Sequence, residues 1–166
     1  MSYVLRSEHQ LKVIESSIII QASADRVWMI LTGLESYAHW NPFVIFAKGP
    51  LIVGQHFQIR RITDLYAGLN YGTVTSVDED EYTLSWTIYW VTPRLFNTIY
   101  LFTIEPHDAE SVCLTQRETL TGLIPMMVQR GWLNTLQSYM VSENKALKRF
   151  AEDKQHRLPH LWSSTT

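Results

Sequence analysis

The sequence predicts an α+β domain in which a seven-stranded, curved antiparallel sheet wraps around a long C-terminal helix, with two short helices after the first strand. Three observations predict it. A strand-like segment near the N-terminus precedes a short helical pattern, six alternating segments follow, and a long stripe of helical spacing ends the chain. A sheet with one apolar face needs a cover, and one long helix is available to supply it.

The first elements are a strand and a helix. Residues Val13–Gln21 have the β-branched core typical of a strand. Ser23 stands where a helix N-cap belongs, and Asp25 puts a negative charge in the first turn, where it suits the helix dipole. Apolar residues then recur at helical spacing as far as Gly33, which is a typical helix end, and Leu34–Tyr37 can form one further short turn.

A sharp corner leads into the sheet. Pro42 biases Asn41 away from the helical conformation, so the short helix must end there and a strand must begin. The Asn41 amide is expected to bond the freed backbone groups. His39, beside this corner, is expected to face solvent.

Six further strands are separated by turn signals such as an acidic run at 78–81 and a Thr-Pro pair at 92–93. Their close spacing predicts a meander of antiparallel neighbours. The predicted strands are Phe43–Ala47, Gln55–Ile62, Leu69–Val77, Tyr82–Trp90, Thr98–Glu105 and Val112–Thr121.

One long helix is predicted over Pro125–Glu152, because apolar residues fall on a single stripe with period 3.6. The domain is therefore expected to span residues 13–152. Residues 1–12 form an N-terminal extension, and residues 153–166, which lack periodicity, form a loosely held tail.

Composition excludes several classes of function. The formal net charge is −2 and no basic stripe alternates with aromatics, so a nucleic-acid partner is not expected. The single cysteine, Cys113, rules out an internal disulfide and is typical of a reducing compartment. No apolar run reaches the length of a membrane span or of a signal-peptide core. A cytoplasmic monomer or homodimer without an integral membrane segment is expected.

The residues that usually carry chemistry are scattered. The six histidines lack the spacing of a metal site, and Pro159 breaks the helix that His156 and His160 would need. There is no nucleophile elbow and no glycine-rich phosphate loop. Cys113 faces outward by alternation, away from the predicted core. Neither a metal nor a cofactor is expected.

Strand alternation predicts which side chains face the interior. In the last strand the aliphatic residues share a face with Gln116 and Glu118, so both polar groups should point inward. Arg61 alternates with the apolar residues of its own strand. An unpaired buried carboxylate is costly, so functional and structural interpretations of Glu118 are both open. It contacts a polar group of a ligand or acts as a general base, or it forms a structural ion pair with Arg61 or reaches water at the end of the strand.

Five segments together resemble the START-like (SRPBCC) superfamily, and they cover roughly residues 13–152. The opening signature is a helix with Val-Trp followed by Trp-Asn-Pro-Phe; the later motifs are a glycine before the third strand, a Leu-x-Trp strand, a last strand with Gln-x-Glu, and the end of the long helix. In this sequence they read ASADRVWMILTGLESYAHWNPFV, GPLIVGQHFQI, YTLSW, TQRETLTGLIP and ENKALKRFAE.

The resemblance implies a helix-grip fold with a deep, mostly apolar cavity between the sheet and the long helix. It also shows one departure, because Tyr100, two residues before Phe102, stands where a subset of the family has a histidine. The role of that histidine does not carry over. The predicted catalytic residues are Glu118 and Tyr100. The predicted ligand contacts are Tyr37, Trp40, Phe43, Ile59, Arg61, Trp86, Trp90, Phe102, Gln116, Met127, Leu136 and Met140.

Three functions fit these observations. The first is binding of a small hydrophobic molecule, whether aromatic, polyketide, isoprenoid or lipid-like. The second is a cyclase or dehydratase of the polyketide type, with Glu118 as acid/base. The third is an interaction module that uses its surface. The aromatic loop segments 63–70 and 91–97 either gate the cavity, bind a partner or fold back over the core.

Overall fold

The computed structural model describes residues 7–8, 11–90, 92 and 94–153. All seven predicted strands are present, together with a two-residue strand at the N-terminus. The strands are β1 (Ser7–Glu8), β2 (Leu11–Ile20), β3 (Val44–Lys48), β4 (His56–Ile62), β5 (Ala67–Asp78), β6 (Thr83–Tyr89), β7 (Asn97–Pro106) and β8 (Val112–Thr121). The helices are α1 (Ala24–Thr32), the 3₁₀ turn η1 (Leu34–Ser36), α2 (Tyr37–Trp40), α3 (Leu123–Met127) and α4 (Arg130–Glu152).

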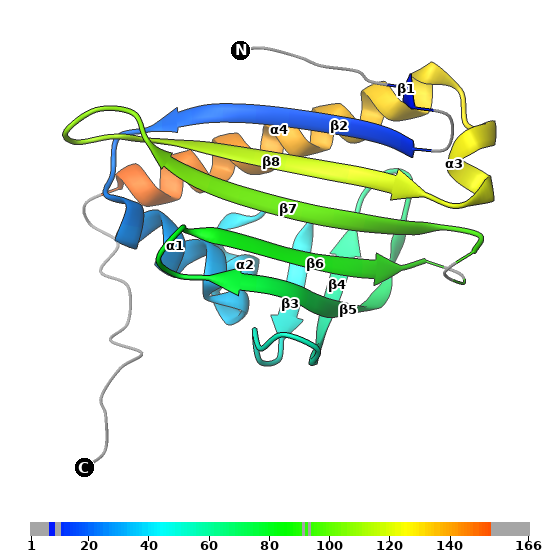
Figure 1. The fold of residues 1–166 in the computed structure, drawn as a ribbon, viewed down its shortest axis with the longest axis horizontal. Helices are drawn as coiled ribbons and strands as arrows, with labels where there is room; N and C mark the ends of the chain where they lie inside the picture. The colour runs from blue at the N-terminus through cyan, green and yellow to red at the C-terminus, as the bar shows by residue number, and fades with distance from the viewer. Residues whose placement is uncertain (1–6, 9–10, 91, 93, 154–166) are drawn as a thin grey trace.

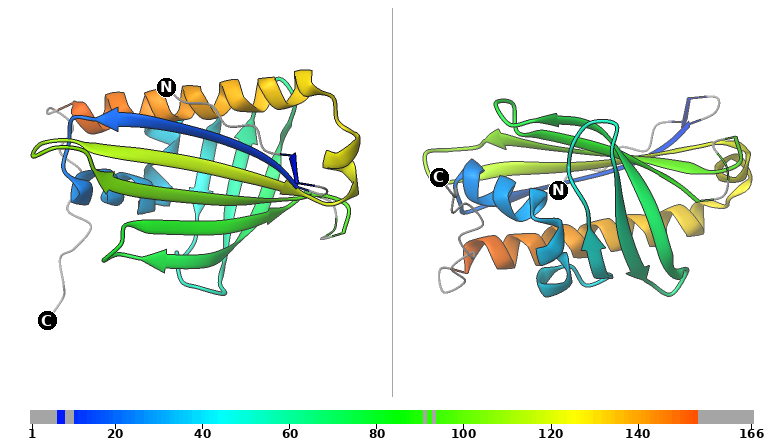
Figure 2. Two further views of the ribbon diagram at one scale, coloured as in Figure 1. Left: turned by 45° about the horizontal axis from the view of Figure 1, so that its top comes forward. Right: turned by 90° about the horizontal axis from the view of Figure 1, so that it is seen from below.

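The strands form one antiparallel sheet with the order β1-β2-β8-β7-β6-β5-β4-β3 (Figure 1). From β3 to β8 every strand pairs with the next one along the chain, as the predicted meander requires. The connection through α1 and α2 carries the chain from β2 to the opposite edge of the sheet. The sheet curls, and α4 runs along its concave side (Figure 2), which is the predicted helix-grip arrangement.

The long helix is tied to the edge strand β2. Because β1 pairs with β2 only at Leu11 and Lys12, most carbonyls on that edge have no strand partner among the described residues. Side chains of α4 serve instead: Gln137 Nε2 donates to the Glu15 carbonyl at 2.9 Å, and Lys148 Nζ donates to the Ile19 carbonyl at 2.7 Å. These bonds satisfy an exposed strand edge and fix the position of the helix over the sheet.

The predicted cap and corner are both present. Ser23 Oγ accepts a hydrogen bond from the Arg26 amide at 3.3 Å, so Ser23 is the N-cap of α1. At the corner, Asn41 Oδ1 accepts from the amides of Phe43 and Val44 at 2.9 and 3.1 Å. One side chain thus stands in for the backbone acceptors that are lost when α2 ends. His39 is exposed, as predicted.

The single C-terminal helix predicted over Pro125–Glu152 is wrong in one respect. The chain is helical to Met127, extended at Val128 (φ −76°, ψ 143°) and Gln129, and helical again from Arg130. Lys12 Nζ donates to the Val128 carbonyl at 3.1 Å, which gives the interrupted backbone a partner outside the helix. The short α3 therefore turns away from the axis of α4.

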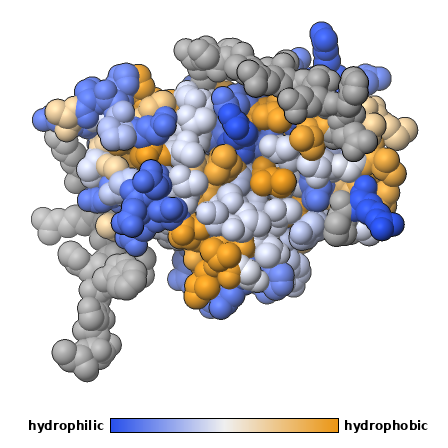
Figure 3. All heavy atoms as spheres, viewed as in Figure 1, coloured by the Kyte–Doolittle hydropathy of each residue, from blue (hydrophilic) through white to orange (hydrophobic). Residues whose placement is uncertain are grey.

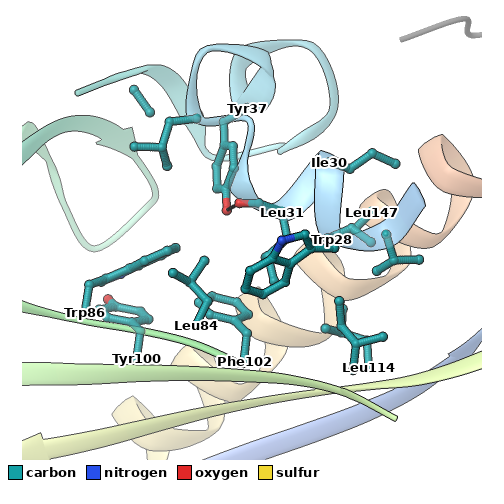
Figure 4. Packing of buried hydrophobic residues seen from close by; sticks show 14 of the residues in the cluster. Trp28, Ile30, Leu31, Tyr37, Leu84, Trp86, Tyr100, Phe102, Leu114 and Leu147 are labelled. Atoms are coloured by element: carbon teal, nitrogen blue, oxygen red, sulfur yellow. Dashed lines mark hydrogen bonds between the residues drawn. The ribbon is translucent and has the colours of Figure 1, made fainter. Parts of the chain in front are cut away.

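The main core lies where α1 and α2 pack on the sheet. Trp86, Tyr100 and Phe102 rise from the strands towards Leu31 and Tyr37 (Figure 4). Their rings meet at short distances, with centroids 5.0 Å apart for Trp86 and Phe102. The Tyr37 hydroxyl donates to the Leu31 carbonyl at 2.7 Å, so this buried polar group is satisfied within the helical layer.

Exposed hydrophobic side chains are scattered over the face seen in Figure 3. Some lie at the lower edge over the loop between β3 and β4, where Ile52 and Val53 are exposed, and others lie at the right-hand edge over α3. Within the described residues, no helix is both long enough and apolar enough to cross a bilayer.

Candidate functional site

Two adjacent spaces lie between the concave face of the sheet and α4. The larger one, here called the cavity, has a volume of about 170 Å³. Its lining residues are Arg61, Thr63, Leu65, Tyr66, Trp90, Phe96, Thr98, Tyr100, Glu118, Leu120, Trp132, Leu136 and Tyr139. The smaller one, here called the inner space, has a volume of about 20 Å³, which is enough for roughly one water molecule.

The inner space lies deeper along α4. It is lined by Tyr37, Trp40, Asn41, Val44, Ile59, Arg61, Trp86, Tyr100, Phe102, Gln116, Glu143, Asn144 and Leu147. Arg61 and Tyr100 line both spaces and so stand at the boundary between them. The two spaces lie one after the other along one stripe of α4. Residues 132, 136 and 139 of this stripe line the cavity, and residues 143 and 147 line the inner space.

The polar side chains are placed by strand register. Glu118 of β8 is paired directly with Tyr100 of β7, which is paired in turn with Trp86 of β6. Directly opposed residues in an antiparallel pair have Cβ atoms about 4.5–5.5 Å apart, so the carboxyl and the phenol stand side by side on the concave face. Gln116 lies two residues before Glu118 on the same face, and both are buried, as the alternation predicted.

The buried ion pair of the site does not involve Glu118. Arg61 forms a salt bridge with Glu143 of α4 rather than with Glu118. Glu143 is buried, with 5% of its surface exposed. Gln116 Nε2 lies 3.4 Å from one oxygen of Glu118 and 3.4 Å from one oxygen of Glu143, so the amide bridges the two carboxyl groups.

The charge balance explains how Glu118 titrates. It is 7% exposed, and burial raises its pKa to about 8, with the nearby Glu143 raising it and the Arg61 charge lowering it. One guanidinium faces two carboxyl groups, and Glu143 holds the salt bridge. At neutral pH the Glu118 carboxyl is therefore mostly protonated and can act as a hydrogen-bond donor.

The neighbouring groups keep their protons. Burial raises the pKa of Tyr100 well above its usual value, and the Glu118 charge adds to the effect, so this phenol is a donor and not a base. Burial lowers the pKa of Arg61, but the carboxylates of Glu143 and Glu118 outweigh that effect, and the guanidinium stays charged. Burial likewise raises the pKa of Tyr37. With its pKa raised to about 8, Glu118 is the cavity group that can exchange a proton near neutral pH.

Aromatic rings close the outer end of the cavity. Tyr66 meets Trp90 edge to face with centroids 4.8 Å apart, and Trp90 stacks on Phe96 at 5.8 Å. Trp90 Nε1 donates to Thr98 Oγ1 at 2.9 Å, which fixes the indole. Thr63, Leu65 and Tyr66 of segment 63–70 line the cavity. This position is compatible both with a gate and with a loop folded over the core. Of segment 91–97, residues 91 and 93 lie outside the described residues.

Most predicted site residues lie on the two spaces, but three do not. Met127 is 84% exposed, because α3 turns away from the axis of α4. Met140 is buried in a separate apolar cluster with Ile14 and Leu120. Phe43 packs on Tyr139 with centroids 4.9 Å apart and lines neither space.

Sequence reasoning missed several cavity residues, namely Thr63, Leu65, Tyr66, Phe96, Thr98, Leu120, Trp132 and Tyr139. Some carried a usable signal: Leu120 alternates with Glu118, and Trp132 and Tyr139 lie at helical spacing around Leu136. The loop residues of segments 63–70 and 91–97 carried only a general signal, their aromatic content, because the path of a loop is not periodic and does not show which side chains face the cavity.

A metal site is not formed by the part of the chain that the structure describes, since no group of three or more His, Cys, Asp or Glu side chains converges there. The arrangement instead offers an apolar cavity with one polar end. Such a site can orient a small molecule and can exchange a proton with it through Glu118.

Comparisons with known proteins agree with this architecture. Residues 12–152 match the protein family described as "Polyketide cyclase / dehydrase and lipid transport". A search of curated protein sequences found no match. The family match confirms the resemblance to the START-like superfamily that the sequence motifs indicated.

Three solved structures share the fold. The Zhui aromatase/cyclase from Streptomyces sp. R1128 has a TM-score of 0.71 and 17% identity, over 86% of this chain and 94% of that one. A START superfamily protein from Mycobacterium smegmatis has a TM-score of 0.68 and 16% identity, over 84% and 97%. Ara h 8.0201 has a TM-score of 0.67 and 12% identity, over 85% and 97%.

Proposed function

This chain belongs to the polyketide cyclase / dehydrase and lipid transport family, and from that premise we propose that it binds a small, largely hydrophobic molecule in the cavity between the sheet and α4. The observation that carries the proposal is the cavity of about 170 Å³, whose lining is mostly apolar and aromatic. An apolar cavity of about 150 Å³ is large enough to bind benzene. The volume therefore suits one ring with a short substituent.

The polar end of the cavity supports a defined orientation of the ligand. Arg61, Tyr100 and Glu118 stand together on three strands, and rigid strands hold such groups more closely than loops do. The apolar body of the ligand would lie against Trp90 and Leu136. Predicted contacts that line only the inner space, such as Trp86 and Gln116, would hold Arg61, Tyr100 and Glu118 in place rather than touch the ligand.

The test is to fill the cavity. Freshly purified protein is examined by native mass spectrometry for a co-purifying ligand, and an anilinonaphthalene sulfonate dye is titrated into the wild type and into Leu136→Trp. The wild type should bind the dye, and the variant should lose at least tenfold in affinity because the indole occupies the cavity. Leu69→Trp, the same change on an exposed outer position of β5, should bind like the wild type. Equal binding by all three proteins would overturn the proposal, and co-purification of a protein partner without any ligand would favour an interaction module.

A second candidate function is a cyclase or dehydratase reaction in the same cavity, with Glu118 moving the proton. The favouring observation is the Glu118 pKa of about 8, because an acid/base group works best when its pKa is near the working pH. Tyr100 would donate a hydrogen bond to the reacting oxygen. A chain folded into several rings would need more room than 170 Å³, since pockets for larger ligands usually measure about 300–1,000 Å³.

Glu118→Gln separates the two candidates. For an enzyme, the variant should keep ligand binding and lose turnover by at least a hundredfold, which is the usual scale of general acid–base catalysis. For a carrier, the same variant should change affinity alone.

A further inference from the structure

The polar end of the cavity contains more carboxyl groups than cationic groups. Glu118 and Glu143 are both buried, and the one guanidinium near them, Arg61, is bridged to Glu143. Among the residues that the structure describes, the direct hydrogen bond to the Glu118 carboxyl is the 3.4 Å contact from Gln116 Nε2. In the described part of the chain, no salt bridge of its own compensates an ionised Glu118.

The walls of the cavity are unusually aromatic. Six of its lining residues carry rings: Tyr66, Trp90, Phe96, Tyr100, Trp132 and Tyr139. The faces of such rings attract cations, and the attraction grows when water is excluded. The hydroxyl of Tyr139 is buried with no hydrogen-bond partner among the described residues, and its oxygen can accept from an N–H group.

We propose that the natural ligand of this cavity carries a positively charged amine on a single aromatic ring or an apolar body of similar size, with the ammonium group on Glu118 and the ring among Trp90, Phe96 and Trp132. This inference rests on the proposed function, because it names the chemical class of the molecule held in that cavity. Once Glu118 is ionised, a bound cation balances the charge of two carboxylates and one guanidinium, and phenol oxygens accept its remaining N–H donors.

The positive charge of Arg61 does not oppose this assignment, because Glu143 neutralises it. The charged and titratable groups that surround Glu118 are Arg61 from β4, Glu143 from α4 and Tyr100 from β7. With Glu118 ionised, one cation and two anions are present. An ammonium ligand makes the sum zero without moving any of them.

The proposal predicts how affinity changes with pH. Glu118 is mostly protonated below about pH 8, so an ammonium ligand must displace that proton when it binds. Affinity should therefore rise about tenfold from pH 6 to pH 7, since one proton is released in binding. A ligand that accepts a hydrogen bond from the protonated carboxyl should keep its affinity over this range.

The experiment compares three probes that differ in charge and hardly in size: benzylamine, which stays protonated over this range, benzyl alcohol and benzoate. Isothermal titration calorimetry at pH 6 and pH 7 measures each with the wild type. Benzylamine should bind at least tenfold more tightly than either other probe at pH 7, with the stated rise. In Glu118→Gln the preference should shrink to threefold or less, whereas Glu105→Gln, which removes an exposed carboxylate of β7, should keep it.

The outcomes are separable. Equal or tighter binding of benzyl alcohol or benzoate, or benzylamine binding that is flat or falling with pH, overturns the amine assignment and leaves the proposed function standing. Failure of all three probes and of the dye counts against the proposed function itself. If Glu118→Gln does not fold, the order of the probes and the pH profile of the wild type decide the question alone.

Discussion

The two ends of the space beside α4 are built from the same kinds of side chain, yet the inner end is nearly solid, with about 20 Å³ free, and the outer end is hollow, with about 170 Å³. At the inner end, Trp86 packs on Phe57 at 5.2 Å and on Phe102 at 5.0 Å, and all three are buried. At the outer end, Trp90 and Trp132 are only partly buried and border a cavity of about 170 Å³. Bulk alone therefore does not decide whether an interior is filled.

The difference lies in the number of layers over the sheet. At the inner end α1 and α2 insert Trp28, Leu31 and Tyr37 beside α4, so the strands meet a second and a third helix (Figure 4). At the outer end the N-terminal half of α4 is the only helix whose residues line the cavity, and the rest of the wall comes from strands and loops. The polar groups Arg61 and Tyr100 mark the boundary between the two ends.

The largest expected effect comes from breaking the ion pair of the inner end. Glu143→Ala leaves the Arg61 guanidinium buried without its partner, and the free energy of unfolding should fall by about 3–5 kcal/mol. Urea unfolding followed by circular dichroism measures it. The control is Glu15→Ala at the Arg117 pair, where half of the arginine side chain is exposed and the expected loss is about 0–1 kcal/mol. Equal losses would show that the buried pair has no special role.

The same Leu→Ala substitution, made once at each end, tests the packing difference directly. Leu84 is fully buried in the solid end, so Leu84→Ala should cost about 2–5 kcal/mol through lost transfer energy and a new void. Leu136→Ala enlarges a cavity that already exists at a half-buried position, and about 1 kcal/mol is expected. The same unfolding experiment compares them. A larger cost at Leu136 would mean that the outer end is packed as tightly as the inner end.

The pH dependence of stability tests the boundary residue Glu118. Its pKa is about 8 when folded and 4.5 by its ordinary value, so between these values the folded state keeps a proton that the unfolded state has released. Stability should therefore fall as the pH rises through this window, by up to about 1.4 kcal/mol per pH unit, and level off above it. Unfolding free energies at pH 5.5, 6.5 and 7.5 are compared between the wild type and Glu118→Gln. Parallel curves for the two proteins would contradict the raised pKa.

Much of this arrangement follows from the sequence, and the reason is periodicity. Alternation placed Gln116 and Glu118 on the inner face of β8, since a strand leaves only two choices for each side chain. The corner at Asn41 followed from Pro42 and the capacity of an amide to accept backbone bonds. Local rules of this kind depend on neighbours in the chain.

The partner of Arg61 could not be obtained in this way. Its pairing with Glu143 depends on the curl of β4 and on the rotation of α4 about its axis, and these are set by packing across the whole interior. The placement of Met127 failed for a related reason. A stripe of period 3.6 runs through residues 125–152, but the break at Val128 is held by Lys12, which lies more than a hundred residues away in the chain.

The smallest effect is expected from removing the hydroxyl of one tyrosine at the inner end and of one at the outer end. Tyr37→Phe removes the hydroxyl that donates to the Leu31 carbonyl at 2.7 Å and leaves that carbonyl unpaired, so about 1–2 kcal/mol of stability should be lost. Tyr139→Phe removes a buried hydroxyl that has no partner among the described residues, so its effect on stability should lie within about 0.5 kcal/mol. Thermal and urea unfolding measure both changes. If the Tyr139 hydroxyl binds the ligand, Tyr139→Phe should weaken benzylamine binding several-fold, whereas Tyr37→Phe should leave it unchanged. A stability loss in Tyr139→Phe equal to that in Tyr37→Phe would show that the Tyr139 hydroxyl is bonded within the protein and does not serve a ligand.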